Sequence, residues 1–174
     1  MGKKRVIFFG VLAALVASVW LSTSRLNASD KGGSSAGALA TSRRPLPSHR
    51  LLDLNRQEVA ADDLSRGRVL LVFMTTSCEP CVEEAKIIAR LHAAAPPGLK
   101  IYGVSFERPA QVATFVKEFD LKFTMLTDAN AQLIRALDIH HFPTTLLLED
   151  GLITAARRGV TRDEADLYRQ LGIH

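Results

Sequence analysis

The strongest constraint on the fold of this chain is a run of seven residues at 68–74, with the sequence RVLLVFM. An uninterrupted run of aliphatic, β-branched and aromatic residues is typical of a strand that is buried on both faces. Each face of a sheet that contains such a strand must be covered, and helices on both sides are the usual solution. The run therefore predicts an α/β domain.

Strands and helices alternate along the rest of the chain. Two short extended stretches are expected around 49–59, and further strands over 99–105, 123–126, 144–148 and 152–158. Helices are expected after the cysteine pair, where Val82, Ala85, Ala89 and His92 share one face, then over 109–119 and 128–137. Asp150-Gly151 predicts a hairpin between the last two strands, and a capping box of Thr161 and Glu164 predicts a closing helix. This order predicts a sheet with one antiparallel edge.

Two cysteines follow the first strand in the sequence Cys78-Glu79-Pro80-Cys81. At the start of a helix, unpaired N–H groups and the positive end of the helix dipole stabilise a thiolate on the first cysteine. Pro80 suits the first turn, where its missing N–H is no loss. Cys81 comes one helical turn later and is directed further inside. The spacing therefore predicts redox chemistry, in which Cys78 attacks and Cys81 resolves the mixed disulfide.

Other uses of a cysteine pair have weaker support. A disulfide across four residues constrains little of the chain. A zinc site needs a second pair of ligands, and the chain has only two cysteines. A copper(I) metallochaperone is the strongest alternative from another class, with His140 or His141 as a third ligand beside the two thiolates. The leading hypothesis includes no metal site and no cofactor.

Basic charge is concentrated at the N-terminal end. The whole chain has a net charge of +4, but residues 1–48 have a net charge of +6 and the other 126 residues a net charge of −2. A nucleic-acid-binding domain needs a basic surface on its folded part, so nucleic acid is excluded as a partner.

An uncharged apolar run at 6–21 follows Lys3, Lys4 and Arg5. With the uncharged residues that continue to 24, a helix of about 28 Å is possible, which is enough to span a bilayer core. Residues 1–24 are therefore expected to form an uncleaved signal-anchor, with a cleaved signal peptide as the alternative. The basic cap directs everything after residue 24 to the non-cytoplasmic side. Residues 25–48, rich in Ser, Gly and Ala, predict a flexible linker before a folded domain at 49–174.

Two segments resemble the signatures of the thioredoxin superfamily, VLLVFMTTSCEPC at 69–81 and IHHFPTTLLLEDG at 139–151. With the anchor and the linker, they are similar to membrane-anchored thiol-disulfide oxidoreductases of the TlpA/ResA type. The resemblance implies a thioredoxin-like α/β fold, a central mixed sheet flanked by helices, behind an N-terminal membrane anchor. Peroxiredoxins share this fold, but their Pro-x-x-x-Thr-x-x-Cys pattern is absent, because Leu71 stands at the proline position.

The resemblance also implies roles for single residues. Cys78 and Cys81 match the redox-active disulfide pair. Pro143 matches the cis-proline that lies against this pair, and a cis peptide there exposes backbone groups to a bound substrate chain. Phe142 and Thr144, on either side of Pro143, are therefore expected to bind substrate.

Two departures from the family concern the surroundings of the cysteines. Ser77 stands where the family usually has a tryptophan, and Val72 stands where thioredoxin buries an aspartate. A buried thiol still needs a base to lose its proton. Glu107, after the strand at 99–105, matches a functional glutamate of the family, which makes it the candidate proton carrier.

The expected function is that of an enzyme, a membrane-tethered thiol-disulfide oxidoreductase in the periplasm or an equivalent space. The resemblance implies protein disulfide substrates, for example apocytochrome c, and a membrane-embedded thiol as electron donor. Glu79 favours a reductant, because a neighbouring carboxylate disfavours a thiolate and strong oxidants have a stabilised reduced form. A thiol oxidant or isomerase on the same fold remains an alternative.

Overall fold

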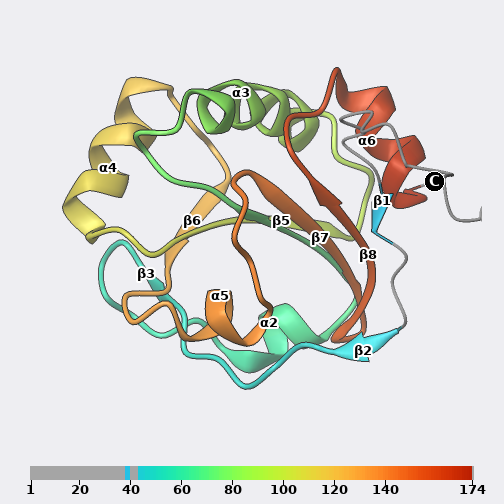
Figure 1. The fold of residues 1–174 in the computed structure, drawn as a ribbon, viewed down its shortest axis with the longest axis horizontal. Coiled ribbons are helices and arrows are strands. Elements are labelled where there is room, and N and C mark those ends of the chain that lie inside the picture. The colour runs from blue at the N-terminus through green and yellow to red at the C-terminus, as the bar shows by residue number, and fades with distance from the viewer. Residues whose placement is uncertain (1–37, 40–42, 174) are drawn as a thin grey trace, which may run out of the picture. The chain divides into compact units, whose positions relative to one another are not determined.

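A mixed β-sheet forms the centre of the domain (Figure 1). The structure is a computed structural model that describes residues 38–39 and 43–173. The strands follow the order β1-β8-β7-β4-β5-β6-β3, and β2 also pairs with β8. Strands β4, β5 and β6 are parallel to one another. Strand β7 runs antiparallel to β4, and β8 runs antiparallel to β7. The strands are β1 (Ala38–Leu39), β2 (Arg44–Pro45), β3 (Leu52–Asp53), β4 (Arg68–Phe73), β5 (Leu99–Ser105), β6 (Thr124–Thr127), β7 (Thr144–Glu149) and β8 (Leu152–Arg158).

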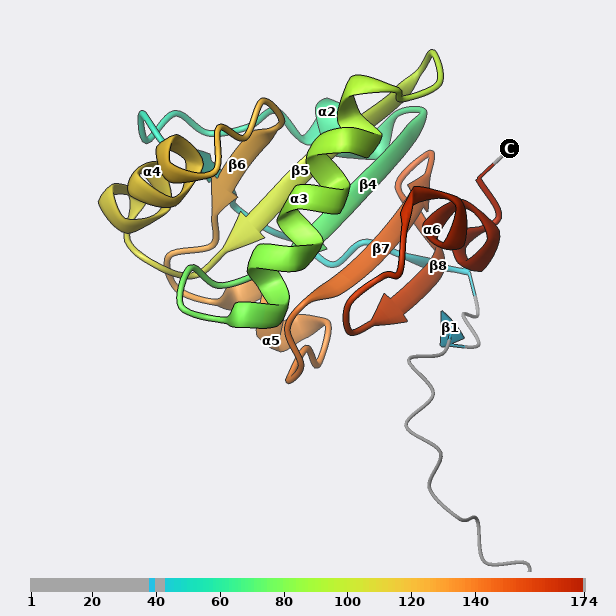
Figure 2. The same cartoon turned by 90° about the horizontal axis from the view of Figure 1, so that it is seen from above.

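Helices cover both faces of this sheet. Helices α3 (Glu79–Ala93), α4 (Pro109–Glu118) and α6 (Glu164–Leu171) lie on one side, and α2 (Ala61–Ser65) and α5 (Gln132–Ala136) lie on the other (Figures 1 and 2). Strand β4 supplies both cores, because successive side chains point to opposite faces. Leu70 and Val72 pack with α3, α4 and α6, whereas Leu71 and Phe73 pack with α2 and α5.

The predicted thioredoxin-like α/β sheet is confirmed, but it is antiparallel at both edges instead of one, because β3 pairs antiparallel with β6. Strands β5 and β8 have the predicted bounds, β4 and β7 differ from prediction by one residue at one end, and β6 is shifted by one residue. Asp150 and Gly151 both have positive φ, 49° and 77°, as a two-residue hairpin turn requires. The early extended stretches appear as β3 and a single bridge between Leu52 and Glu58.

The buried face of α3 differs from the predicted one. Val82, Ala89 and His92 are only half-buried. The buried side chains are instead Cys81, Glu84, Ala85, Ile87, Ile88 and Leu91. Ala85 is common to both sets, but Cys81 and Glu84 are also buried, so the centre of the buried face is rotated toward them.

The predicted capping box at the last helix is wrong. Asp163 is the N-cap of α6 and accepts a hydrogen bond from the Asp166 amide at 2.7 Å. Thr161 is instead buried, and its hydroxyl donates to Glu84 on α3. At α5 the Asp128 carboxylate does accept amide hydrogen bonds, from Gln132 at 2.9 Å and from Ile134 at 3.0 Å. The helix itself begins only at Gln132.

The region predicted as linker contributes to the sheet from Ala38 onward. Strands β1 and β2 lie within 25–48 and pair with β8. The predicted anchor at 1–24 lies outside the described residues. Among the residues that are described, no helix combines the length and the apolar character that crossing a membrane requires.

Candidate active site

The two cysteines lie where β4 ends and α3 begins, and their environments differ. Cys78 is the N-cap of α3 and is half-buried, whereas Cys81 is fully buried. Both are free thiols. The Cys81 amide donates to Cys78 Sγ at 3.3 Å. A thiolate on Cys78 would accept this backbone hydrogen bond at the positive end of the helix dipole. Both effects stabilise the negative charge that a sulfur carries when it attacks or leaves in a disulfide exchange.

Burial raises the pKa of Cys81 to about 12. The neighbouring Cys78 contributes to this raised pKa, and hydrogen bonds with Thr75 limit the rise. Cys81 therefore holds its proton at neutral pH. A thiol that holds its proton does not attack, so Cys81 needs a base before it can react.

The segment before β7 lies against Cys78. The Phe142–Pro143 peptide bond is cis, the geometry that the resemblance implied. The Cys78 thiol donates to the Phe142 carbonyl oxygen at 3.8 Å. Pro143 and Thr144 are buried, and the Thr144 hydroxyl donates to the His141 carbonyl at 2.7 Å. The structure thus brings Phe142 and Pro143 to the cysteines, while the side chain of Thr144 is engaged within its own turn.

Glu107 holds the loop that leads to Cys78. Its carboxylate accepts from the Thr76 amide at 2.7 Å, from the Thr76 hydroxyl at 2.9 Å and from the Ser105 hydroxyl at 3.0 Å. Ser105 ends β5 and Thr76 follows β4, and these two strands are parallel neighbours. Glu107 therefore connects the carboxyl ends of two strands at the loop that leads to the cysteine pair.

Glu84 is a buried carboxylate that the sequence analysis missed. It lies on α3 three residues after Cys81, on the same buried face, and its side chain is fully buried. It accepts from the Thr161 amide at 2.6 Å, from the Thr161 hydroxyl at 2.8 Å and from the Thr145 hydroxyl at 3.5 Å. Burial raises the pKa of Glu84 above its ordinary value, and the Thr161 donors and the Arg157 charge offset part of that rise. The sequence does contain a sign of this burial: Glu84 lies three residues after Cys81 and four before Ile88, a spacing that places all three on one face of a helix.

Arg157 is the charged partner of Glu84. Its side chain on β8 is 1% exposed and lies 3.9 Å from the Glu84 carboxylate. The guanidinium also donates to Gln170 at 2.6 Å and to the carbonyl oxygens of Gly159 and Val160. Burial lowers the pKa of Arg157, and the Glu84 charge opposes that change. The pair connects α3 to β8 and, through Gln170, to α6.

His140 and His141, the candidate third ligands of a copper site, lie at the surface. His140 Nε2 lies 2.7 Å from the Asp138 carboxylate. Within residues 38–39 and 43–173, no group of three or more His, Cys, Asp or Glu side chains is arranged to hold a metal ion. The described residues therefore do not assemble the third ligand that the copper(I) alternative requires.

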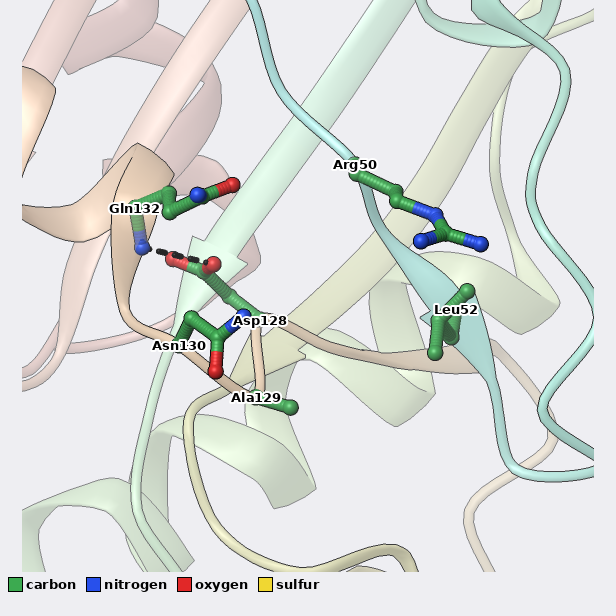
Figure 3. Close-up of a pocket in the computed structure, with 6 residues that line it drawn as sticks. All are labelled: Arg50, Leu52, Asp128, Ala129, Asn130 and Gln132. Atoms are coloured by element: carbon green, nitrogen blue, oxygen red, sulfur yellow. Dashed lines mark hydrogen bonds between the residues drawn. The ribbon is translucent and has the colours of Figure 1, made fainter.

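A small hollow of about 80 Å³ lies apart from the cysteines, beside Asp128 and Arg50 (Figure 3). The Asp128 carboxylate is turned to the Gln132 amide and also accepts from the Ile134 amide. Arg50 points away from Asp128, and its guanidinium donates to Glu58 at 3.0 Å. Both charged side chains that line this hollow thus form hydrogen bonds with other residues of the domain.

Comparison with known proteins agrees with the geometry. Residues 43–156 match the AhpC/TSA family. The chain is 29% identical over 152 residues to the thiol-disulfide oxidoreductase ResA of Bacillus subtilis, which covers 85% of this chain and 82% of that protein. It is 30% identical over 125 residues to ResA of Halalkalibacterium halodurans, and this alignment covers 70% of this chain and 71% of that protein. The crystal structure of StoA from Bacillus subtilis matches the fold with a TM-score of 0.62 at 20% identity, over 73% of this chain and 98% of that chain.

The family match covers more than half of the chain, and the similarity to ResA extends over most of both proteins. The chain has a cysteine pair at the start of α3, and the names of these relatives describe thiol-disulfide chemistry. The chain therefore belongs to the AhpC/TSA family and is a thiol-disulfide oxidoreductase with a thioredoxin-like fold.

Proposed function

We propose that this protein reduces disulfides of protein substrates through Cys78 and Cys81. The Cys78 thiolate attacks one sulfur of the substrate disulfide, and the other substrate sulfur leaves as a thiolate that takes up a proton. Cys81 then loses its proton and attacks Cys78, which releases the second substrate sulfur as a thiol. Two electrons pass from the protein dithiol to the substrate, and Cys78 and Cys81 end as a disulfide.

One observation carries this proposal, the unequal burial of the two cysteines. Cys78 is half-buried beside the Phe142 carbonyl, so a substrate sulfur can reach it. Cys81 lies fully buried directly behind it in α3, where a large substrate has no access. This arrangement supports Cys78 as the attacking thiol and Cys81 as the resolving thiol.

Glu107 is the proposed proton carrier for Cys81. It lies at the carboxyl end of β5 and contacts Thr76, two residues before Cys78, which supports a place beside the reacting groups. Glu84 is the second candidate, because it is a buried carboxylate one helical turn from Cys81 with a raised pKa. A carboxyl with a raised pKa exchanges protons closer to neutral pH.

The proposed location is the outer side of the cytoplasmic membrane, with residues 1–24 as the anchor. The relatives named ResA and the basic, apolar start of the chain support this placement. Apocytochrome c is the proposed substrate class, and a membrane-embedded dithiol is the proposed source of electrons that restores the reduced pair. Exposed Glu79, next to Cys78, supports the reducing direction because its charge disfavours a stabilised thiolate.

Trapping of the mixed disulfide tests the roles of the two cysteines. Cys81→Ser removes the resolving thiol, so this variant should accumulate mixed disulfides with its substrates in cells. Cys78→Ser is the matched control and should accumulate none. Non-reducing electrophoresis and mass spectrometry would identify the attached proteins and the sulfur that holds them. Adducts on Cys81 in the Cys78→Ser protein, with none on Cys78 in the other, would contradict the assignment.

A further inference from the structure

Phe106 is an exposed aromatic residue at the edge of the site. Its side chain is 41% exposed, and it is one of two exposed large apolar residues among those that the structure describes, the other being Leu152. Phe106 follows the last residue of β5, next to the end of β4 where the cysteine loop begins. The residues on both sides of Phe106 are held in hydrogen bonds, so its exposed ring has a defined position beside the cysteine loop.

The flanking residues fix the position of Phe106. Ser105 is fully buried, and its hydroxyl donates to Glu107 at 3.0 Å. Glu107 in turn accepts two hydrogen bonds from Thr76 in the cysteine loop. The backbone on either side of Phe106 is therefore attached to the loop that carries Cys78, and the aromatic ring is presented at that loop.

The ring of Phe106 packs on the segment that faces Cys78. Its centroid is 5.8 Å from that of Phe142, with the rings tilted by 48°, a favourable aromatic geometry. Phe142 is half-buried, and its carbonyl lies 3.8 Å from Cys78 Sγ. Phe106 and Phe142 thus form a continuous aromatic surface, which we call the aromatic pair, beside the attacking sulfur.

We propose that the aromatic pair binds an apolar side chain that neighbours the reacting cysteine of the substrate, and that Phe106 determines this preference. Ser77, directly before Cys78, is exposed and has no large apolar side chain, so the apolar surface near the sulfur is that of Phe106, which follows β5. A substrate chain whose cysteine reaches Cys78 passes the Phe142 carbonyl, and its adjacent side chain meets Phe106. This inference rests on the proposed attack by Cys78.

The test uses reduced full-length protein and peptides that each hold one cysteine as a mixed disulfide with 2-mercaptoethanol. One peptide has leucine beside the cysteine and the other has serine. Cys78 forms a bond to the peptide sulfur, 2-mercaptoethanol leaves as a thiolate that takes a proton, and Cys81 then releases the peptide thiol. The small 2-hydroxyethyl disulfide, which has no side chain to contact Phe106, serves as the reference substrate.

Phe106→Ala should lower the second-order rate constant for a single turnover with the leucine peptide about threefold to tenfold, the value of one aromatic contact. The serine peptide and 2-hydroxyethyl disulfide should react as with the unmodified protein. Phe106→Trp should keep the preference for leucine. Leu152→Ala is the matched control, since it removes the other exposed apolar side chain, on the β7–β8 hairpin, and should change none of the three rates.

Equal rates for both peptides in the unmodified protein, or an unchanged preference in Phe106→Ala, would overturn the inference. A dimer of the unmodified protein that Phe106→Ala dissociates in sedimentation would also overturn it, because a second copy would then cover the ring. Failure of the proposed exchange has a different signature: Cys78→Ser would still reduce 2-hydroxyethyl disulfide at the full rate.

Discussion

At the scale of single residues, the fold places two cysteine side chains of the same kind in very different surroundings. Cys78 and Cys81 are three residues apart, yet one is the half-buried cap of α3 and the other is fully enclosed. The difference arises because α3 turns Cys81 toward the sheet while the helix start remains at the surface. The protonation state of Cys81 is therefore the property that we expect a change of pH, or a mutation of a neighbouring base, to alter.

The raised pKa of Cys81 predicts that the reduced protein loses stability at alkaline pH. Its thiol is protonated up to about 12 in the folded protein, whereas an unfolded chain releases the proton near 9.0. The contribution of Cys81 is fully present below 9 and is lost as the pH rises toward 12, by about 1 kcal/mol per pH unit. Denaturant unfolding of reduced protein at pH 8 and pH 10 measures this loss.

Cys81→Ala is the reference for that measurement, because it removes the titrating group and retains all others. The difference in unfolding free energy between the two proteins should shrink from pH 8 to pH 10. A difference that stays constant over this range would show that the folded and unfolded states hold the Cys81 proton equally well.

The proton carrier can be identified with two isosteric changes. Glu107→Gln retains an acceptor for the Thr76 amide, and the Thr76 hydroxyl can turn to accept from the new amide, so the loop should keep its position. If Glu107 carries the proton of Cys81, resolution of the mixed disulfide should slow at least about tenfold at neutral pH. The rate of attack by Cys78 should change little.

Glu84→Gln is the paired measurement, since it removes the titration of the other nearby carboxylate. Rapid-mixing measurements across pH 5–9 would separate the two steps in each variant. A resolution rate and pH profile unchanged in Glu107→Gln but altered in Glu84→Gln would contradict the role proposed for Glu107 and leave it as a brace of the cysteine loop.

At the scale of elements, the buried pair of Glu84 and Arg157 connects α3 to β8. Both side chains are essentially fully buried. The carboxylate has Thr161 as a donor, and the guanidinium has Gln170 and two carbonyl groups as acceptors. A pair with these additional partners is arranged so that neither charge is left alone in the core, which is the condition for a tolerable buried ion pair.

Arg157→Met should destabilise the protein by about 3–5 kcal/mol, because it leaves the Glu84 carboxylate buried without its counter-charge. The loss of unfolding free energy should be larger at neutral pH than at acid pH. Without Arg157 the pKa of Glu84 rises further, so the deficit should be largest at neutral pH and shrink as acid protonates the carboxyl. Urea unfolding at pH 5 and pH 7.5 measures both quantities.

Arg90→Met provides the control for this experiment. Arg90 on α3 pairs with Glu164 on α6, but its side chain is 59% exposed. An exposed pair contributes about 0–1 kcal/mol, so this variant should remain close to the unmodified protein. Equal losses in both variants, or an Arg157→Met deficit that ignores pH, would show that lost packing rather than the uncompensated charge is responsible.

At the scale of the whole molecule, the sheet order brings distant segments to one edge. Strands β7, β4 and β5 are neighbours, and β7 runs opposite to the other two. The carboxyl ends of β4 and β5 therefore meet the start of β7. This arrangement places Cys78, Glu107 and Pro143 at the same edge, although 65 residues separate the first from the last.

The basic, apolar start of the chain predicts that the oxidoreductase domain is held outside the cytoplasm. A reporter that is active only in the cytoplasm, fused after His174, should remain inactive, because Lys3, Lys4 and Arg5 keep the N-terminal end inside. Fractionation should recover the protein with membranes. An active reporter would contradict the orientation, and a soluble form that lacks residues 1–24 would identify cleavage instead of anchoring.

Local sequence patterns were enough to predict the secondary structure around the cysteines and to mark the pair as a candidate for redox chemistry. A continuous apolar run predicts a doubly buried strand, and Asp150-Gly151 predicts a hairpin, because both signals depend on neighbouring residues alone. Cys78 and Cys81 were identifiable for the same reason, since their spacing and their place before a helix are local properties.

The surroundings of these residues, by contrast, depend on contacts between distant parts of the chain. Thr161 carries a capping pattern, but it serves Glu84, because a buried carboxylate 77 residues away needs its donors more than the helix does. Arg157 lies in a strand where its burial depends on Gln170 of a later helix, and Phe106 reaches Phe142 only through the pairing of β4 with β5 and β7. Such contacts join residues far apart in the chain, and local patterns contain no information about which distant group will satisfy a buried charge or meet an exposed ring.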